Sequence, residues 1–101
     1  MTLKSPSEIT TMAELRGQID HLDRELVALL ALRQVHIDRA AQIKPNEGMP
    51  ARITSRVDDV LNKVTQTAVE KGFDPDLARS MWAQMIEAMI AREERVLGPD
   101  K

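Results

Sequence analysis

The sequence predicts an all-α protein in which three helices of unequal length are joined by short loops. The chain of 101 residues is rich in Leu, Ile, Met, Ala, Glu and Arg, which favour helices. Apolar residues recur at spacings of three and four over three stretches, as they do on one face of a helix. Proline and glycine lie between these stretches, where loops are expected.

The first helix is predicted over residues 11–44. Thr11, followed three residues later by Glu14, forms a capping-box pattern at its start. Pro45 ends it, because the residue before a proline disfavours the helical conformation. We expect residues 1–10 to form a disordered tail, since they are polar and lack periodicity.

Two further helices complete the expected domain at residues 11–98. The second begins at Thr54 or Ser55, one of which caps it, and ends at Gly72 as a left-handed C-cap. The third begins with Asp74 as its N-cap, followed by proline at the first helical position, and continues to about residue 97.

The length of the first helix predicts a dimer. A helix over residues 11–44 would be about 50 Å long at 1.5 Å per residue. A compact globule of this size has a radius of gyration of only about 13 Å. Two shorter helices cannot cover such a rod, so half of its apolar stripe would face water in a monomer. An intertwined homodimer, in which two long helices cover each other, resolves this.

Composition excludes several classes of function. A net charge of −2 argues against a nucleic-acid-binding protein, which would carry a basic excess. The absence of cysteine excludes disulfides and thiolate metal sites. No apolar run approaches the roughly 20 residues that span a membrane, and the N-terminus lacks the apolar core of a signal peptide. We therefore expect a cytoplasmic protein with no membrane partner.

Ionisable residues interrupt the apolar faces of all three helices. The stripe of the first helix consists of Leu15, Ile19, Leu22, Leu26, Leu29, Arg33, Ile37, Ala40 and Lys44. At about 100° per residue, Arg33 lies roughly 20° from Leu26, and Lys44 lies roughly 20° from Arg33. Arg56 lies on the apolar face of the second helix and Glu93 on that of the third. Buried charges need partners, so something anionic should meet these cations.

Two interpretations of these four residues are open. In the first, they form a buried salt-bridge set in which Glu93 pairs with Arg33 or Lys44. In the second, they form a binding pocket, because one carboxylate cannot neutralise three cations. A substrate with two carboxylates fits such a pocket, since arginine offers planar bidentate donors to that group.

Over residues 11–97 the chain resembles the all-helical chorismate mutases. The resemblance rests on Leu15-Arg16, Ile19-Asp20, Leu22-Asp23, Leu26, Arg33, Lys44, Pro50, Arg56 and the segment GFDPDLARSMWAQMIEAMIARE. Isochorismate-pyruvate lyases share this fold and much of the pattern. The resemblance implies a domain-swapped homodimer with two pockets, each built from both chains. Arg16 would enter each pocket from the partner subunit.

The resemblance also implies roles for individual residues. Arg16 and Arg33 would hold the two substrate carboxylates, and Arg56 would support the side of the ring carboxylate. Lys44 would reach a carboxylate and the ether oxygen of the enolpyruvyl bridge. Glu93 occupies the position of a side-chain donor to that oxygen, usually a glutamine.

Two positions depart from the mutase pattern. Val57 stands where chorismate mutases commonly place a glutamate that receives the ring hydroxyl, and Met89 replaces a small polar residue. The lyases tend to be apolar at the position of Val57. Three functions therefore stay open: a mutase forming prephenate from chorismate, a lyase forming salicylate and pyruvate from isochorismate, and a non-catalytic helical dimer used in binding or regulation.

The expected chemistry needs no metal and no cofactor. A Claisen rearrangement requires a folded substrate conformer and stabilisation of the negative charge that develops on the ether oxygen. Lys44 can supply that stabilisation as a cation. Glu93 can donate to the oxygen only when it is protonated, so we expect activity to rise toward acidic pH.

Overall fold

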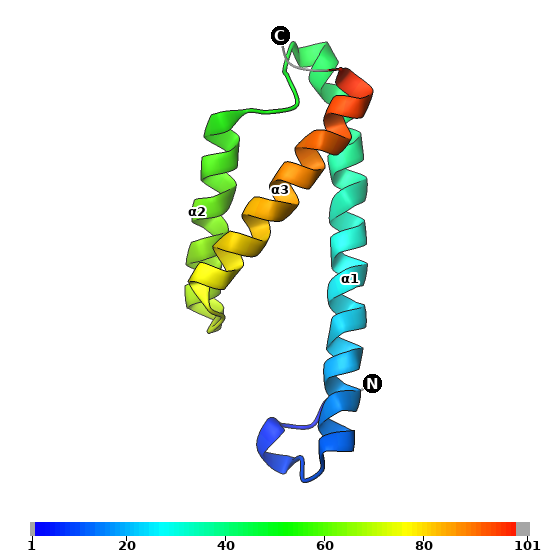
Figure 1. The fold of residues 1–101 in the computed structure, drawn as a ribbon, viewed down its shortest axis with the longest axis vertical. Helices are drawn as coiled ribbons and strands as arrows, with labels where there is room; N and C mark the ends of the chain where they lie inside the picture. The colour runs from blue at the N-terminus through cyan, green and yellow to red at the C-terminus, as the bar shows by residue number, and fades with distance from the viewer. Residues whose placement is uncertain (1, 99–101) are drawn as a thin grey trace. The chain divides into compact units, whose positions relative to one another are not determined.

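The structure is a computed structural model that describes residues 2–98. These residues form three α-helices and two short 3-10 helices, with no strand among them (Figure 1). The α-helices are α1 (Met12–Ile43), α2 (Thr54–Lys71) and α3 (Pro75–Leu97), and the 3-10 helices are η1 (Pro6–Glu8) and η2 (Lys44–Glu47). The prediction of an all-helical chain with one long and two shorter helices is confirmed.

The chain divides between Val35 and His36 into two compact units, so the division falls within α1. The first unit holds η1 and most of α1. The second holds the last turns of α1, η2, α2 and α3.

In the first unit, side chains fix the beginning of α1. The Glu14 main-chain N–H donates to Oγ1 of Thr11 at 3.2 Å, which confirms the predicted cap. Lys4 forms a 2.6 Å ion pair with Glu14, and its main chain exchanges hydrogen bonds of 2.6 and 3.1 Å with the Gln18 side chain. The segment before α1 is therefore connected to the helix, while the division into a tail at 1–10 and a domain at 11–98 stays a prediction.

Large apolar side chains on α1 are exposed in the single chain. Leu22, Leu26 and Leu29 of the predicted stripe are 45, 57 and 63% exposed. Monomeric proteins rarely leave a contiguous apolar face of this kind in water. The sequence predicts that a second copy of the chain covers this stripe, and the homodimer stays a prediction.

In the second unit, α2 and α3 pack against each other as a helical hairpin (Figure 1). Gly72 turns the chain between them with φ at 78°, a left-handed conformation that glycine adopts without steric cost. Oδ1 of Asp74 accepts hydrogen bonds from the main-chain N–H groups of Asp76 and Leu77 at 3.0 and 3.2 Å. The predicted C-cap of α2 and N-cap of α3 are confirmed.

The predicted cap of α2 is wrong. Ile53 is the N-cap residue and Thr54 is already helical, with no side chain capping the helix. The main-chain carbonyl of Ile53 accepts hydrogen bonds from the main-chain N–H groups of Arg56 and Val57 at 3.0 Å each. The Ile53 side chain is half-buried. An apolar residue thus occupies the N-cap position of α2, where Ser or Thr would be expected.

The α-helix α1 ends one residue before the predicted end at Lys44, and a short 3-10 helix follows it. The α-helix ends at Ile43, and Lys44 begins the 3-10 helix η2, in which Pro45 is accommodated because the first turn needs no proline N–H. Gly48 ends η2 with φ at 68°. Lys44 is therefore placed where α1 passes into the loop that leads to α2.

The core of the second unit includes a residue of that loop. Ala51, Ile86 and Ile90 form its buried centre at 5, 7 and 6% exposure. The partly buried side chains packed around this centre are Val57, Val60, Leu61, Trp82 and Leu97. The core thus joins both helices of the hairpin to the segment after Lys44.

Candidate functional site

Glu93 on α3 is the one charged side chain of residues 2–98 that is buried, at 5% exposure. Its Oε2 lies 2.6 Å from Nζ of Lys44, and the two side chains are 6 and 17% exposed. The structure therefore brings together one predicted cation and the predicted acid, from positions 49 residues apart in the sequence. An ion pair this enclosed is held more strongly than a surface pair, because little water screens it.

A second contact defines the direction of the Lys44 ammonium group. Its Nζ also donates to the main-chain carbonyl of Ala51 at 2.7 Å. An ammonium group has three N–H donors. Glu93 and Ala51 accept two of them, which leaves the third for another acceptor.

On α2, Arg56 and Val57 have different surroundings. The Arg56 side chain is 62% exposed, and its guanidinium donates to Asp59 at 2.6 Å. Hydrogen bonds from Lys63 and Arg56 lower the pKa of Asp59. Val57 is half-buried and packs against the core. Arg56 is thus paired along its own helix in the single chain, and its role in binding substrate stays a prediction.

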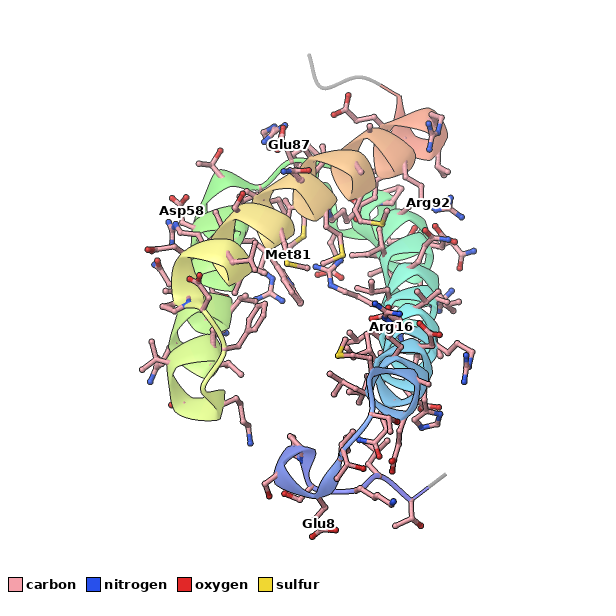
Figure 2. All side chains as sticks on the ribbon, turned by 60° about the horizontal axis from the view of Figure 1, so that its bottom comes forward. Glu8, Arg16, Asp58, Met81, Glu87 and Arg92 are labelled. Atoms are coloured by element: carbon pink, nitrogen blue, oxygen red, sulfur yellow. The ribbon has the colours of Figure 1, made fainter. Side chains whose placement is uncertain are left out.

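The other predicted ligands lie on α1 and α3. Arg16, labelled in Figure 2, is exposed on α1, and Arg33 is half-buried on the same helix. Both belong to the first unit. Met89 is half-buried on α3 in the second unit. The assignment of Arg16, Arg33 and Met89 to a substrate site stays a prediction.

The sequence analysis missed two bidentate ion pairs in the second unit. Asp38, near the end of α1, accepts hydrogen bonds of 2.6 and 3.0 Å from Arg92 on α3 (labelled in Figure 2). Arg52, in the loop before α2, donates hydrogen bonds of 2.9 and 2.6 Å to Glu87 on α3. Each pair joins segments far apart in the sequence, so helical periodicity gives no signal for it. Arg92 directly precedes Glu93, so the first pair fixes α1 and α3 close to the buried ion pair.

Replacing Asp38 with asparagine is expected to destabilise the protein at neutral pH and to make stability less dependent on acid. A hydrogen bond from Arg92 lowers the pKa of Asp38 below its usual 3.8. A carboxylate with a lowered folded-state pKa stabilises the fold above its unfolded-state pKa, and this contribution is lost as pH falls through the folded-state pKa. The difference in melting temperature between wild type and D38N should therefore be largest at pH 7. It should shrink once the pH falls below the usual pKa and vanish below the lowered, folded-state pKa.

Asp58→Asn provides the matched control for this measurement, because Asp58 is an exposed acid on α2. It should leave the melting temperature almost unchanged at both pH values. If D38N lowers the melting temperature equally at pH 7 and at pH 3, the substitution acts through packing and not through charge.

Two features are absent from the described part of the chain. Within residues 2–98, no three His, Asp or Glu side chains come together in a group that could hold a metal ion. In the same residues no helix has both the length and the apolar character needed to cross a membrane. This site offers a cation held by two acceptors, its buried acid, and a third N–H of Lys44 that neither acceptor uses.

Comparison with known proteins identifies the family. The chorismate mutase type II family model matches residues 15–94, which is more than half of the chain. The chain belongs to the chorismate mutase type II family. The matched segment of this family member contains both Lys44 and Glu93. The resemblance predicted from the sequence is therefore confirmed.

Two relatives of this chorismate mutase family member have different names. An isochorismate pyruvate lyase of Pseudomonas aeruginosa is 30% identical over 92 residues, which are 90% of this chain and 89% of the lyase. A T-protein of Haemophilus influenzae is 27% identical over 89 residues, which are 88% of this chain but only 24% of that protein. The similarity thus covers nearly the whole lyase but only about a quarter of the T-protein.

Proposed function

We propose that the chain is a chorismate mutase that converts chorismate to prephenate at a site centred on Lys44. The observation that carries this proposal is the buried 2.6 Å pair between Lys44 and Glu93, which holds a cation in a mostly enclosed place. Membership of the chorismate mutase type II family supports the choice of reaction.

The reaction requires what this site offers. In the rearrangement the ether C–O bond breaks while a C–C bond forms, so the substrate isomerises without a nucleophile or a leaving group. Negative charge develops on the ether oxygen as the bond breaks. The third N–H of Lys44 would donate to that oxygen, and a fixed donor in a poorly solvated place stabilises such charge most effectively.

The proposed substrate also needs partners for its two carboxylates. Arg16 and Arg33 are the side chains proposed for this role, because a guanidinium binds a carboxylate through two parallel hydrogen bonds. Arg56 is proposed to support the ring carboxylate. Its high exposure leaves it free to turn from Asp59 toward a ligand.

A homodimer is part of the proposal. The exposed leucines of α1 would be covered by α1 of a second copy, which removes their apolar surface from water. Arg16 would then reach the site of the partner subunit.

The second candidate is an isochorismate-pyruvate lyase, favoured by two observations. Val57 packs against the core, so its position supplies no acceptor for the ring hydroxyl of chorismate. The relative that is 30% identical over most of both chains is named as such a lyase. In that reaction a ring hydrogen moves to the enolpyruvyl group as the ether bond breaks, giving salicylate and pyruvate, and the same cation would stabilise the ether oxygen.

Product analysis tests the proposal. We expect the purified protein to form prephenate from chorismate, with the activity sedimenting at the mass of a dimer. Salicylate and pyruvate from isochorismate, without prephenate from chorismate, would replace the mutase by the lyase. No product from either substrate, with a folded dimer, would contradict both and leave a non-catalytic helical dimer.

A further inference from the structure

The side chain and the main-chain carbonyl of the loop residue Ala51 make different contacts. Its methyl group is buried at 5% exposure against Ile86 and Ile90 of α3. Its carbonyl oxygen accepts a 2.7 Å hydrogen bond from Nζ of Lys44. A small apolar side chain thus fixes the position of a main-chain acceptor that contacts the ammonium group.

The residue after Ala51 is also connected to α3. The Ala51 carbonyl belongs to the peptide unit that continues into Arg52. The Arg52 guanidinium donates hydrogen bonds of 2.9 and 2.6 Å to Glu87, which Figure 2 labels on α3. Because a peptide unit is planar, fixing both of its neighbours restricts the direction of its oxygen.

Two acceptors are needed to aim the third donor of an ammonium group. With Glu93 alone, the ammonium group could rotate about its carbon–nitrogen bond and tilt around one hydrogen bond. A second acceptor at 2.7 Å removes that freedom, since the three N–H bonds have fixed tetrahedral angles. The direction of the third N–H then follows from the positions of Glu93 and Ala51.

We propose that Ala51 is a positioning residue that acts through Lys44: its buried methyl group holds its carbonyl where that oxygen aims the third N–H of Lys44 at the substrate. This inference rests on the proposed function, in which that N–H meets the ether oxygen. Ala51 itself need not touch the substrate. Its effect should therefore appear in the chemical step rather than in substrate binding.

Ala51→Val tests the proposal, because two added methyl groups in a filled core displace the loop main chain. We expect kcat to fall by about tenfold, given that a misplacement of about 1 Å in an active site can cost up to about 100-fold. KM should stay close to the wild-type value, since the donor is used mainly in the transition state. Circular dichroism and melting temperature report whether the fold persists.

Ala78→Val is the matched control. Ala78 lies on α3 and is 2% exposed, so the same substitution overpacks a comparably buried position. It lies near the start of α3, whereas Glu93 lies near its end. We expect a similar loss of melting temperature with kcat unchanged. An equal fall in kcat in both variants would overturn the proposal, because loss of packing alone would then explain the effect.

A second measurement needs no substrate. Acylation of Lys44 by an amine-reactive ester, followed by mass spectrometry, reports how firmly its ammonium group is held. We expect the rate at Lys44 to rise several-fold in Ala51→Val and to stay unchanged in Ala78→Val. If Ala51→Val does not fold, Ala51→Gly, which removes the buried methyl group, replaces it with the same expected result.

The two measurements separate failure of this inference from failure of the proposed function. Faster acylation of Lys44 with no turnover of chorismate or isochorismate by wild type would leave Ala51 as the positioning residue of Lys44 but reject the enzyme. Normal turnover in the wild type with acylation and kcat unchanged in Ala51→Val and Ala51→Gly would reject the role of Ala51.

Discussion

Lys44→Met is expected to cause the largest loss of activity of any single substitution. It removes the donor proposed for the ether oxygen while keeping a side chain of similar length. Loss of one fixed donor to a developing oxyanion costs about 100- to 1,000-fold in kcat. Since this donor carries a full charge, we expect the upper end of that range. Steady-state kinetics with chorismate measures the loss of kcat. If isochorismate is the substrate, the same measurement is made with isochorismate.

The same substitution should also lower stability, which needs separating from the loss of catalysis. Lys44→Met leaves Glu93 buried without its cation, and breaking such a pair costs about 3 kcal/mol in the free energy of unfolding. The double variant Lys44→Met/Glu93→Leu should recover much of that stability, because neither charge is then buried. It should recover no activity. Recovery of activity together with stability would show that Lys44 serves only the fold.

Lys63→Met is the matched control for this prediction. Lys63 lies on α2, is 69% exposed and forms its 3.1 Å ion pair with Asp59 at the surface. Surface pairs contribute about 0–1 kcal/mol, so its removal should change neither stability nor kcat appreciably. A loss of activity like that of Lys44→Met would mean that overall charge, and not the position of Lys44, drives turnover.

Much of the fold could be predicted because the signals for it are local. The Thr11 cap, the Gly72 turn and the Asp74 N-cap each depend on a residue type and its neighbours within four positions. The start of α2 could not be predicted in this way. Ile53 takes the N-cap position, and its half-buried side chain depends on the packing of the hairpin, which local sequence does not contain.

The site was predictable to the extent that helical phase reveals it. A charge on an apolar face predicts burial, and Lys44 and Glu93 both follow this rule. The same rule predicts a buried Arg56, but in the single chain this side chain is exposed. A long side chain near the start of a helix can turn outward, here to Asp59. The rule could not predict the contact with the Ala51 carbonyl, because every residue has a main-chain acceptor whatever its side chain.

Glu93→Gln is expected to change the dependence of activity on pH. In the structure Oε2 of Glu93 accepts a hydrogen bond from Lys44. An ionised carboxylate only accepts, so Glu93 can donate to the ether oxygen only after it gains a proton. We therefore expect kcat/KM of the wild type to rise toward acidic pH, by up to about tenfold per pH unit if one proton is required. A glutamine amide donates at every pH, so E93Q should show a flatter profile.

Acid also weakens the fold, so the profiles need a stability control at each pH. Hydrogen bonds from Arg92 and Arg52 lower the pKa of Asp38 and of Glu87, and both pairs lose their contribution as pH falls through those values. Circular dichroism should show a folded protein over the range used for kinetics. Glu94→Gln is the matched variant, since Glu94 is the next residue on α3 and is half-buried. Its profile should follow the wild type.

The outcome for Glu93 decides between two uses of the same ion pair. If protonated Glu93 donates to the ether oxygen, it must release its hydrogen bond from Lys44 or keep it on one oxygen while donating from the other. E93Q can do the second without a proton, so its activity at neutral pH should exceed that of the wild type. If wild type and E93Q have identical profiles, Glu93 serves only to hold the Lys44 ammonium group. A glutamine oxygen can accept from Lys44 as well, so Lys44 would then be the sole donor from this pair.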